Sequence, residues 1–291
     1  MNNNAPRTGQ FQSQRLTLSY VEWGAPDAAP LFLVHGGWDQ KRSWDDVARH
    51  LAKSYRVIAH DLRGHGASEW VSDGDYGVMD HVFDLASLID HIGAENPIIV
   101  SHSLGGNISL RYTGLYPERV KKLVAIEGLG PSPKLLEERK SKPVDERLRE
   151  WIDQRRQLSD KSSRVMANLD EAIERMKARH KHLPDALVRH LSETGVKTNP
   201  DGTVSWAYDP AGLGKSPSDI TPEEFQTLWT KITCPTWLVY GADSWASDPS
   251  KDGRADKFSN ATVTVMENAG HWLHHDQFDT FIAGLDKFLA A

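Results

Sequence analysis

The stretch at residues 98–107 constrains this 291-residue chain more than any other. Residues 98–100 are apolar, uncharged and β-branched, as in a buried strand, and a helical pattern follows the stretch. Between strand and helix stands Ser103, with Ser101 two residues before it and Gly105 two residues after it. A strand that turns this sharply into a helix strains its turning residue, and only small neighbours fit around the turn. The stretch therefore predicts a serine hydroxyl above a sheet edge, close to free N–H groups of the new helix.

Strand patterns alternate with helical patterns along most of the chain. Amphipathic helices are expected at 78–92 and 276–291. This rhythm predicts an α/β fold with a mostly parallel, doubly wound sheet. The expected strands, besides the one that leads into Ser103, are 16–23, 31–34, 55–59, 122–126, 236–240 and 261–266.

The rhythm breaks after Gly128. Residues 131–231 have almost no strand pattern and carry charged, amphipathic segments, so we expect a helical cap inserted late in the sheet. The core is then formed by 15–130 and 232–291, and the polar segment 1–14 is predicted to be a flexible N-terminus.

Composition narrows the classes of partner. The formal net charge is −6, with both signs spread along the chain, which argues against a nucleic-acid surface. Apolar runs stay shorter than the roughly 18 residues that a membrane span needs, and the N-terminus lacks the apolar core of a signal peptide. The single cysteine, Cys234, has no internal disulfide partner. We therefore expect a cytoplasmic protein that acts on a small molecule, without nucleic-acid or membrane partners; a homodimer is compatible with the sequence.

Several loops that follow predicted strands carry residues suited to nucleophilic catalysis. Ser103 needs a base to remove its proton, and His271, in a Gly-His turn after the last strand, fits that role. An oxyanion hole needs two backbone N–H donors. Leu104 directly follows the serine, and Gly37 lies in the His-Gly-Gly turn after the strand at 31–34, so these two residues are the expected donors.

These motifs, in this order, resemble the α/β-hydrolase superfamily. The resemblance rests on residues 35–37, 61–68, 101–106 and 270–271, and the insertion resembles the family's cap. More narrowly, the chain resembles capped serine hydrolases of the esterase group. Relatives that open epoxides or displace halide use an aspartate at the elbow, so the serine implies acyl transfer instead. The resemblance also implies that 61–68 is a structural turn.

The acid that orients His271 has two candidates. In most relatives an aspartate follows the strand after the cap, at the position that Ser244 occupies here. Asp243 is one residue early, whereas Glu127 ends the strand after the elbow helix, where some capped relatives place their acid. Glu127 is slightly favoured, Asp243 remains the alternative, and Asp248 is a distant third.

The resulting hypothesis is a serine hydrolase that cleaves a carboxylic ester, thioester or lactone through an acyl-enzyme on Ser103. Trp38, Trp245 and Trp272 adjoin the predicted site loops and are candidate substrate-binding residues. No metal and no cofactor are expected, because the histidines match no metal-ligand spacing and no phosphate-binding glycine loop is present. Alternatives are a non-catalytic small-molecule receptor of the same fold, a C–C bond hydrolase, or a cofactor-free enzyme similar to haloperoxidases.

Overall fold

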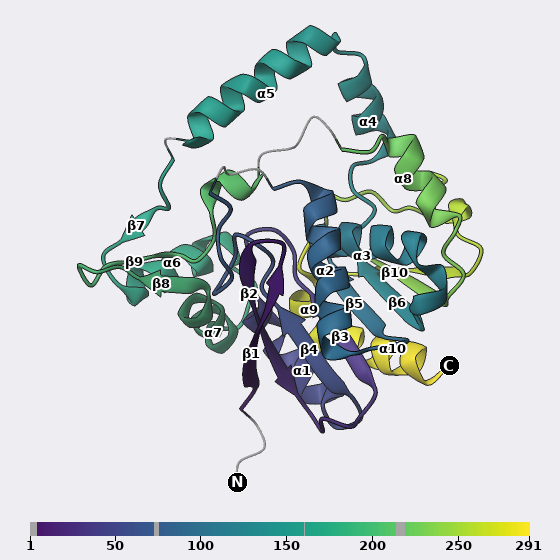
Figure 1. The fold of residues 1–291 in the computed structure, drawn as a ribbon, viewed down its shortest axis with the longest axis horizontal. Coiled ribbons are helices and arrows are strands. Elements are labelled where there is room, and N and C mark those ends of the chain that lie inside the picture. The colour runs from purple at the N-terminus through teal and green to yellow at the C-terminus, as the bar shows by residue number, and fades with distance from the viewer. Residues whose placement is uncertain (1–4, 73–75, 160, 214–218) are drawn as a thin grey trace.

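A computed structural model of the protein describes residues 5–72, 76–159, 161–213 and 219–291. Its centre is an eight-stranded sheet of order β1-β2-β4-β3-β5-β6-β10-β11 (Figure 1). From β4 to β11 the neighbours run parallel, and β2 is antiparallel to both of its neighbours, β1 and β4; this arrangement confirms the predicted, mostly parallel sheet. The strands are β1 (Arg7–Ser13), β2 (Leu16–Trp23), β3 (Pro30–Val34), β4 (Arg56–His60), β5 (Ile98–His102), β6 (Lys122–Ile126), β10 (Thr236–Gly241) and β11 (Ala261–Met266).

Helices cover both faces of this sheet. α2 (Val78–Ile92), α3 (Leu104–Leu115) and α8 (Pro222–Trp229) pack on one face, and α1 (Asp45–Leu51) and α10 (Phe278–Ala290) pack on the other. The central strands are buried on both sides, which explains why their sequences are continuously apolar rather than alternating. The remaining short helices of the core are η1 (Lys41–Trp44), η2 (Pro117–Arg119), η4 (Ala255–Lys257) and α9 (Leu273–Asp276).

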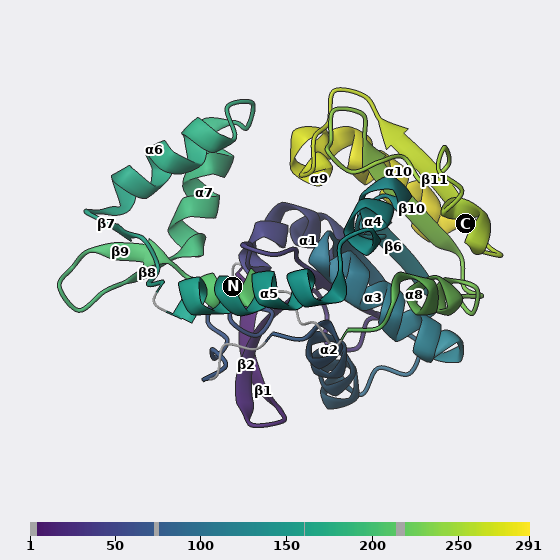
Figure 2. The ribbon, with the colours of Figure 1, turned by 90° about the horizontal axis from the view of Figure 1, so that it is seen from above.

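The cap contains a small sheet as well as helices. Three short strands, in the order β7-β9-β8, lie beside α6 and α7 on one side of the molecule (Figure 2). The expectation of a helical insertion with almost no strand pattern did not include these three strands, because strands of two or three residues are too short to leave a periodic pattern. The cap elements are α4 (Pro133–Lys140), α5 (Val144–Ser159), β7 (Val165–Met166), α6 (Leu169–Arg179), α7 (Asp185–Gly195), β8 (Val196–Thr198), β9 (Val204–Trp206) and η3 (Pro210–Leu213).

Two segment boundaries predicted from the sequence differ from those in the structure. Residues 7–13 of the segment expected to be flexible form β1, an edge strand that pairs with β2; residues 1–4 lie outside the described residues. Only Phe11 and Ser13 of β1 are buried, so its apolar signal is weak. The helix α8 falls inside the predicted cap range 131–231, yet Phe225 and Trp229 belong to the core beneath α3. The α/β core thus resumes before residue 232.

Candidate active site

The turn between β5 and α3 has the strained geometry that the sequence predicts. Ser103 has φ 52° and ψ −115°, a positive-φ backbone conformation that residues other than glycine rarely adopt. A Cβ at Gly105 would lie 2.3 Å from the carbonyl oxygen of Val34, so only glycine lets α3 approach β3 this closely. Ser101, two residues before Ser103, is accommodated in the buried strand because its hydroxyl donates to the carbonyl of Val124 at 2.9 Å.

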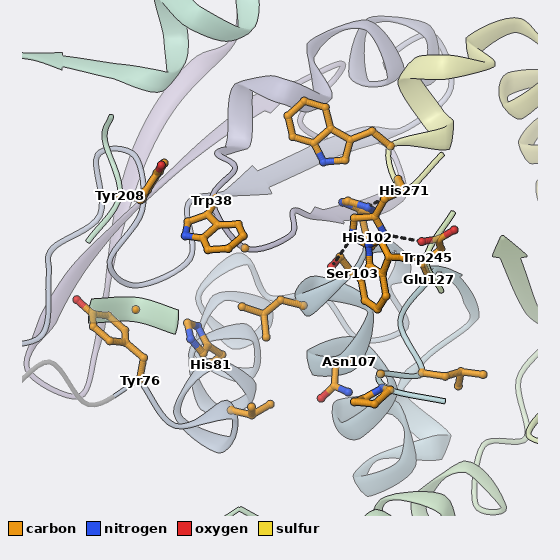
Figure 3. A pocket seen from close by; sticks show the side chains of 18 of the residues that line it. Trp38, Tyr76, His81, His102, Ser103, Asn107, Glu127, Tyr208, Trp245 and His271 are labelled. Atoms are coloured by element: carbon orange, nitrogen blue, oxygen red, sulfur yellow. Dashed lines mark hydrogen bonds and ion pairs between the residues drawn. The ribbon is translucent and has the colours of Figure 1, made fainter. Parts of the chain in front are cut away.

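His271 and Glu127 reach the serine from two other strand ends. The Nε2 atom of His271, in the loop after β11, lies 2.9 Å from Ser103 Oγ. Its Nδ1 is hydrogen-bonded to Oε2 of Glu127, the residue that directly follows β6 (Figure 3). The structure therefore forms one continuous chain of contacts, in which a carboxylate faces one ring nitrogen and a hydroxyl faces the other.

The Glu127 carboxylate is fully buried and saturated with donors. Oε1 accepts the backbone N–H of Gly241 at 2.9 Å, and Oε2 accepts the hydroxyl of Ser244 at 2.7 Å. A buried charge needs such partners. Ser244, the position where most relatives were expected to carry the acid, thus supports Glu127 instead.

The other two candidate acids, Asp243 and Asp248, have surroundings that differ from those of Glu127. Asp243 is exposed, and no hydrogen bond joins its carboxylate to His271 within the described ranges. Its backbone N–H donates to Ala269. The carboxylate of Asp248 caps its own turn through Ser250. Of the three predicted acids, only Glu127 is brought to the histidine.

The two predicted oxyanion donors, Gly37 and Leu104, lie at the same cavity as Ser103. Leu104 is the first residue of α3, so its N–H has no acceptor inside the helix. Gly37 lies in the turn after β3, and both residues line the same cavity as Ser103. His35 fixes that turn, because its Nε2 accepts the N–H of Leu62 at 3.0 Å and its Nδ1 contacts the Gly36 carbonyl at 2.7 Å. This geometry suits a pair of oxyanion donors.

The sequence analysis did not identify His102 as a residue that contacts the His271 loop. His102 is buried beneath the site, and its Nε2 lies 2.8 Å from the backbone carbonyl of His271. A carbonyl only accepts, so this nitrogen carries the proton. Burial holds the pKa of His102 well below its usual range, which keeps the ring neutral. Its place directly before the serine was visible in the sequence, but its partner, 169 residues later, was not.

A cavity of about 1660 Å³ lies above the serine, between the sheet edge and the cap. All three predicted tryptophans line it. Trp38 is 49% exposed and Trp245 is 70% exposed, with its ring centroid 4.9 Å from that of His271 (Figure 3). Large exposed aromatic rings that line a cavity are suited to contact a bound molecule.

Two cap histidines contact the loop that carries His271. His180 stacks on Trp272 with ring centroids 4.3 Å apart and planes nearly parallel. His182 is bonded to Asp276 at 2.6 Å, and the same carboxylate accepts the N–H of Gly270 at 2.8 Å. The cap therefore braces the loop on both sides of His271.

The described residues hold no group of three or more histidine, cysteine or acidic side chains arranged for a metal ion. They also contain no helix with the length and apolarity to cross a membrane. The residues 61–68, expected to be structural, form a buried turn in which Asp61 pairs with Lys41 and accepts the N–H of Ala67 at 2.8 Å.

Comparison with known proteins agrees with this architecture. Residues 29–278 match the family described as alpha/beta hydrolase fold. The chain is similar to esterase YbfF of Escherichia coli, with 25% identity over 90% of this chain and 93% of the relative. A bifunctional esterase/perhydrolase of Acinetobacter calcoaceticus is 37% identical over 38% of this chain and 41% of its own length.

Among solved structures, the thioesterase domain from the curacin biosynthetic pathway superposes with a TM-score of 0.83. The match covers 96% of this chain and 98% of that domain, at 22% identity, and therefore speaks for the fold alone. The family match spans most of the sheet, the elbow, the cap and the His271 loop. This protein is thus a member of the α/β-hydrolase family.

Proposed function

We propose that the protein is a serine hydrolase that cleaves a carboxylic ester, thioester or lactone through an acyl-enzyme on Ser103. The observation that carries the proposal is the contact chain from Ser103 Oγ to His271 and on to Glu127. Esterase relatives support the reaction class. An elbow serine, in place of an aspartate, favours attack on a carbonyl carbon.

In the first half-reaction, His271 Nε2 takes the proton of Ser103 as the serine oxygen attacks the substrate carbonyl carbon. The carbonyl π electrons move to oxygen, and the N–H groups of Gly37 and Leu104 stabilise the resulting oxyanion. Glu127 stabilises the imidazolium. The carbonyl then re-forms, the bond to the leaving alcohol or thiol breaks, and His271 returns the proton to that group.

In the second half-reaction, water replaces the leaving group. His271 removes a proton from the water as its oxygen attacks the acyl carbon, and the same N–H pair receives the negative charge. The new tetrahedral intermediate collapses, the bond to Ser103 breaks, and the serine oxygen regains its proton from His271. The products are a carboxylic acid and the unchanged enzyme.

The test combines turnover with labelling of the serine. The protein is assayed with 4-nitrophenyl acetate and butyrate, and mass spectrometry follows reaction with a serine-directed phosphonate. We expect hydrolysis and one phosphonate adduct on Ser103, with both lost in Ser103→Ala.

Asp243→Asn is the matched control, because it removes an exposed carboxylate from a neighbouring loop. It should keep near-normal rates. Absence of both turnover and adduct in the wild type would contradict the proposal and favour the receptor hypothesis.

A further inference from the structure

The cavity above Ser103 is rich in positive charge, although the chain as a whole is acidic. Seven arginine and lysine residues line the cavity, against three carboxylates, in a protein with a net charge of −6. One of the three carboxylates is Glu127, which is committed to His271. Another, Asp276, is committed to His182 and Gly270. The lining therefore has a local excess of cations.

Three of these cations are neutralised by acidic partners. Asp219 binds the guanidinium of Arg111 through both oxygens, at 2.7 and 2.8 Å. Arg254 and Arg175 are paired with carboxylates outside the lining, at 2.8 Å each. The other four cations have no carboxylate bonded to them in the part of the chain that the structure describes. They are Arg139, Lys161, Arg164 and Arg179.

Arg164 and Arg179 both act on Tyr208, which lines the cavity as Trp38 does (Figure 3). Burial raises the pKa of the Tyr208 phenol, and the charges of both arginines oppose that rise. The guanidinium of Arg179 also lies 5.8 Å from the centre of the Trp38 ring. Since Trp38 directly follows Gly37, this cationic side of the cavity adjoins the oxyanion turn.

An acid that interacts with Arg164, Glu171, is already bonded to other groups. Glu171 feels the charge of Arg164, but it is bonded to the N–H of Ala167 and to Arg175. An arginine without a carboxylate partner presents a planar fork that matches carboxylate and phosphate oxygens. A cavity wall also concentrates the field of its charges. Arg164 and Arg179 are thus available to a bound anion.

We propose that the substrate of this hydrolase carries an anionic group, a carboxylate or a phosphate, that binds to Arg164 and Arg179 while Ser103 attacks its ester or thioester carbonyl. The inference rests on the proposed hydrolase function and adds the charge of the substrate. The anionic group belongs either to the acyl part or to the leaving part, and the two arms of the test separate these cases.

The acyl arm compares mono-4-nitrophenyl glutarate with 4-nitrophenyl pentanoate, which differ in a terminal carboxylate against a methyl group. The leaving-group arm compares 4-acetoxybenzoate with 4-methylphenyl acetate. In at least one arm, kcat/KM for the anionic ester should exceed that for its neutral partner by about tenfold or more, mainly through KM. Because both arginines are exposed to water, the preference should shrink as salt is added.

Arg164→Gln and Arg179→Gln should each reduce that ratio, and the double variant should bring it close to one. Arg179→Lys should keep part of the ratio, because the charge remains while the fork is lost. The matched control is Arg147→Gln, which removes an exposed cap arginine that does not line the cavity. It should leave the ratio as in the wild type.

The inference is overturned if the wild type hydrolyses both members of each pair equally well, or if the double variant keeps the wild-type ratio. If the wild type hydrolyses the esters without preferring the anionic ones, and Ser103→Ala loses this turnover, the inference is rejected and the hydrolase proposal stands. If no ester is turned over, the hydrolase proposal fails instead. Calorimetry of Ser103→Ala with monomethyl glutarate and methyl pentanoate, which differ in a carboxylate against a methyl group, then decides whether the cavity binds anions: equal affinity rejects the inference.

Discussion

The substitution Glu127→Gln tests the core of the site, because the fixed donors around Glu127 dictate how an amide would sit. The N–H of Gly241 lies 2.9 Å from Oε1, and a backbone donor cannot turn away. The amide oxygen must therefore take that place, which leaves the NH₂ group facing Ser244 and His271. An NH₂ group facing Nδ1 forces that nitrogen to accept a hydrogen bond.

The consequence is the wrong tautomer of the histidine. With Nδ1 as acceptor, the proton of the neutral ring moves to Nε2, which lies 2.9 Å from Ser103 Oγ and must be free to take its proton. Loss of a triad acid in this way lowers kcat by about 10⁴-fold, or about 5 kcal/mol of transition-state stabilisation. KM should change little, since Glu127 is buried behind the histidine.

The assay is steady-state hydrolysis of 4-nitrophenyl butyrate by the wild type, Glu127→Gln and Asp243→Asn. Thermal unfolding of each variant checks that the fold is kept. The reasoning is refuted if Glu127→Gln keeps kcat within tenfold of the wild type, or if Asp243→Asn shows the large loss instead.

Three further predictions follow from the same geometry. The double variant Glu127→Ser/Ser244→Asp moves the carboxylate to the neighbouring position, because Ser244 Oγ lies 2.7 Å from Glu127 Oε2. Its kcat should be at least about tenfold higher than that of Glu127→Ser alone. No such recovery in the kinetic assay argues against this exchange. Gly105→Ala should lower the free energy of unfolding by about 1–3 kcal/mol or more, since its Cβ would lie 2.3 Å from the Val34 oxygen; an unchanged urea midpoint contradicts that strain. Burial lowers the pKa of His60 and of His275 from 6.5 to about 4. The unfolded chain therefore binds more protons between these values, and stability should fall as pH drops from about 6.5 to about 4, by up to about 3 kcal/mol per histidine. Urea unfolding across this range checks the slope, which His60→Phe should flatten; an equal slope in that variant would reject the assignment.

Much of the core could be predicted because its signals are local. The apolar strands, their alternation with helices and the small residues around Ser103 each depend on a few adjacent residues. The edge strand β1 escaped prediction because only Phe11 and Ser13 face the interior, and its order comes from pairing with β2. The short strands of the cap escaped for a similar reason, since each is too short to show a period.

The choice between Glu127 and Asp243 was beyond the sequence. Both follow a strand on the same sheet edge, and the direction of each side chain depends on the loop conformation. Glu127 adopts φ 50°, and its carboxylate turns into the interior beneath His271. Asp243, held through its backbone by Ala269, remains exposed. Asp243 lies one residue before the position at which most relatives carry the acid. No local sequence pattern shows how such a shift of one residue turns the side chain.

The sequence by itself determined the sheet, the strained serine and the histidine that follows the last strand, because backbone propensity and steric limits act over short distances. The tertiary structure decided which carboxylate meets that histidine and which cap cations line the cavity above the serine. Arg164, Arg179 and Trp38 share one side of the cavity although they are far apart in the chain. Their meeting depends on how the cap packs over the sheet, since charge and aromatic contacts act through space rather than along the sequence.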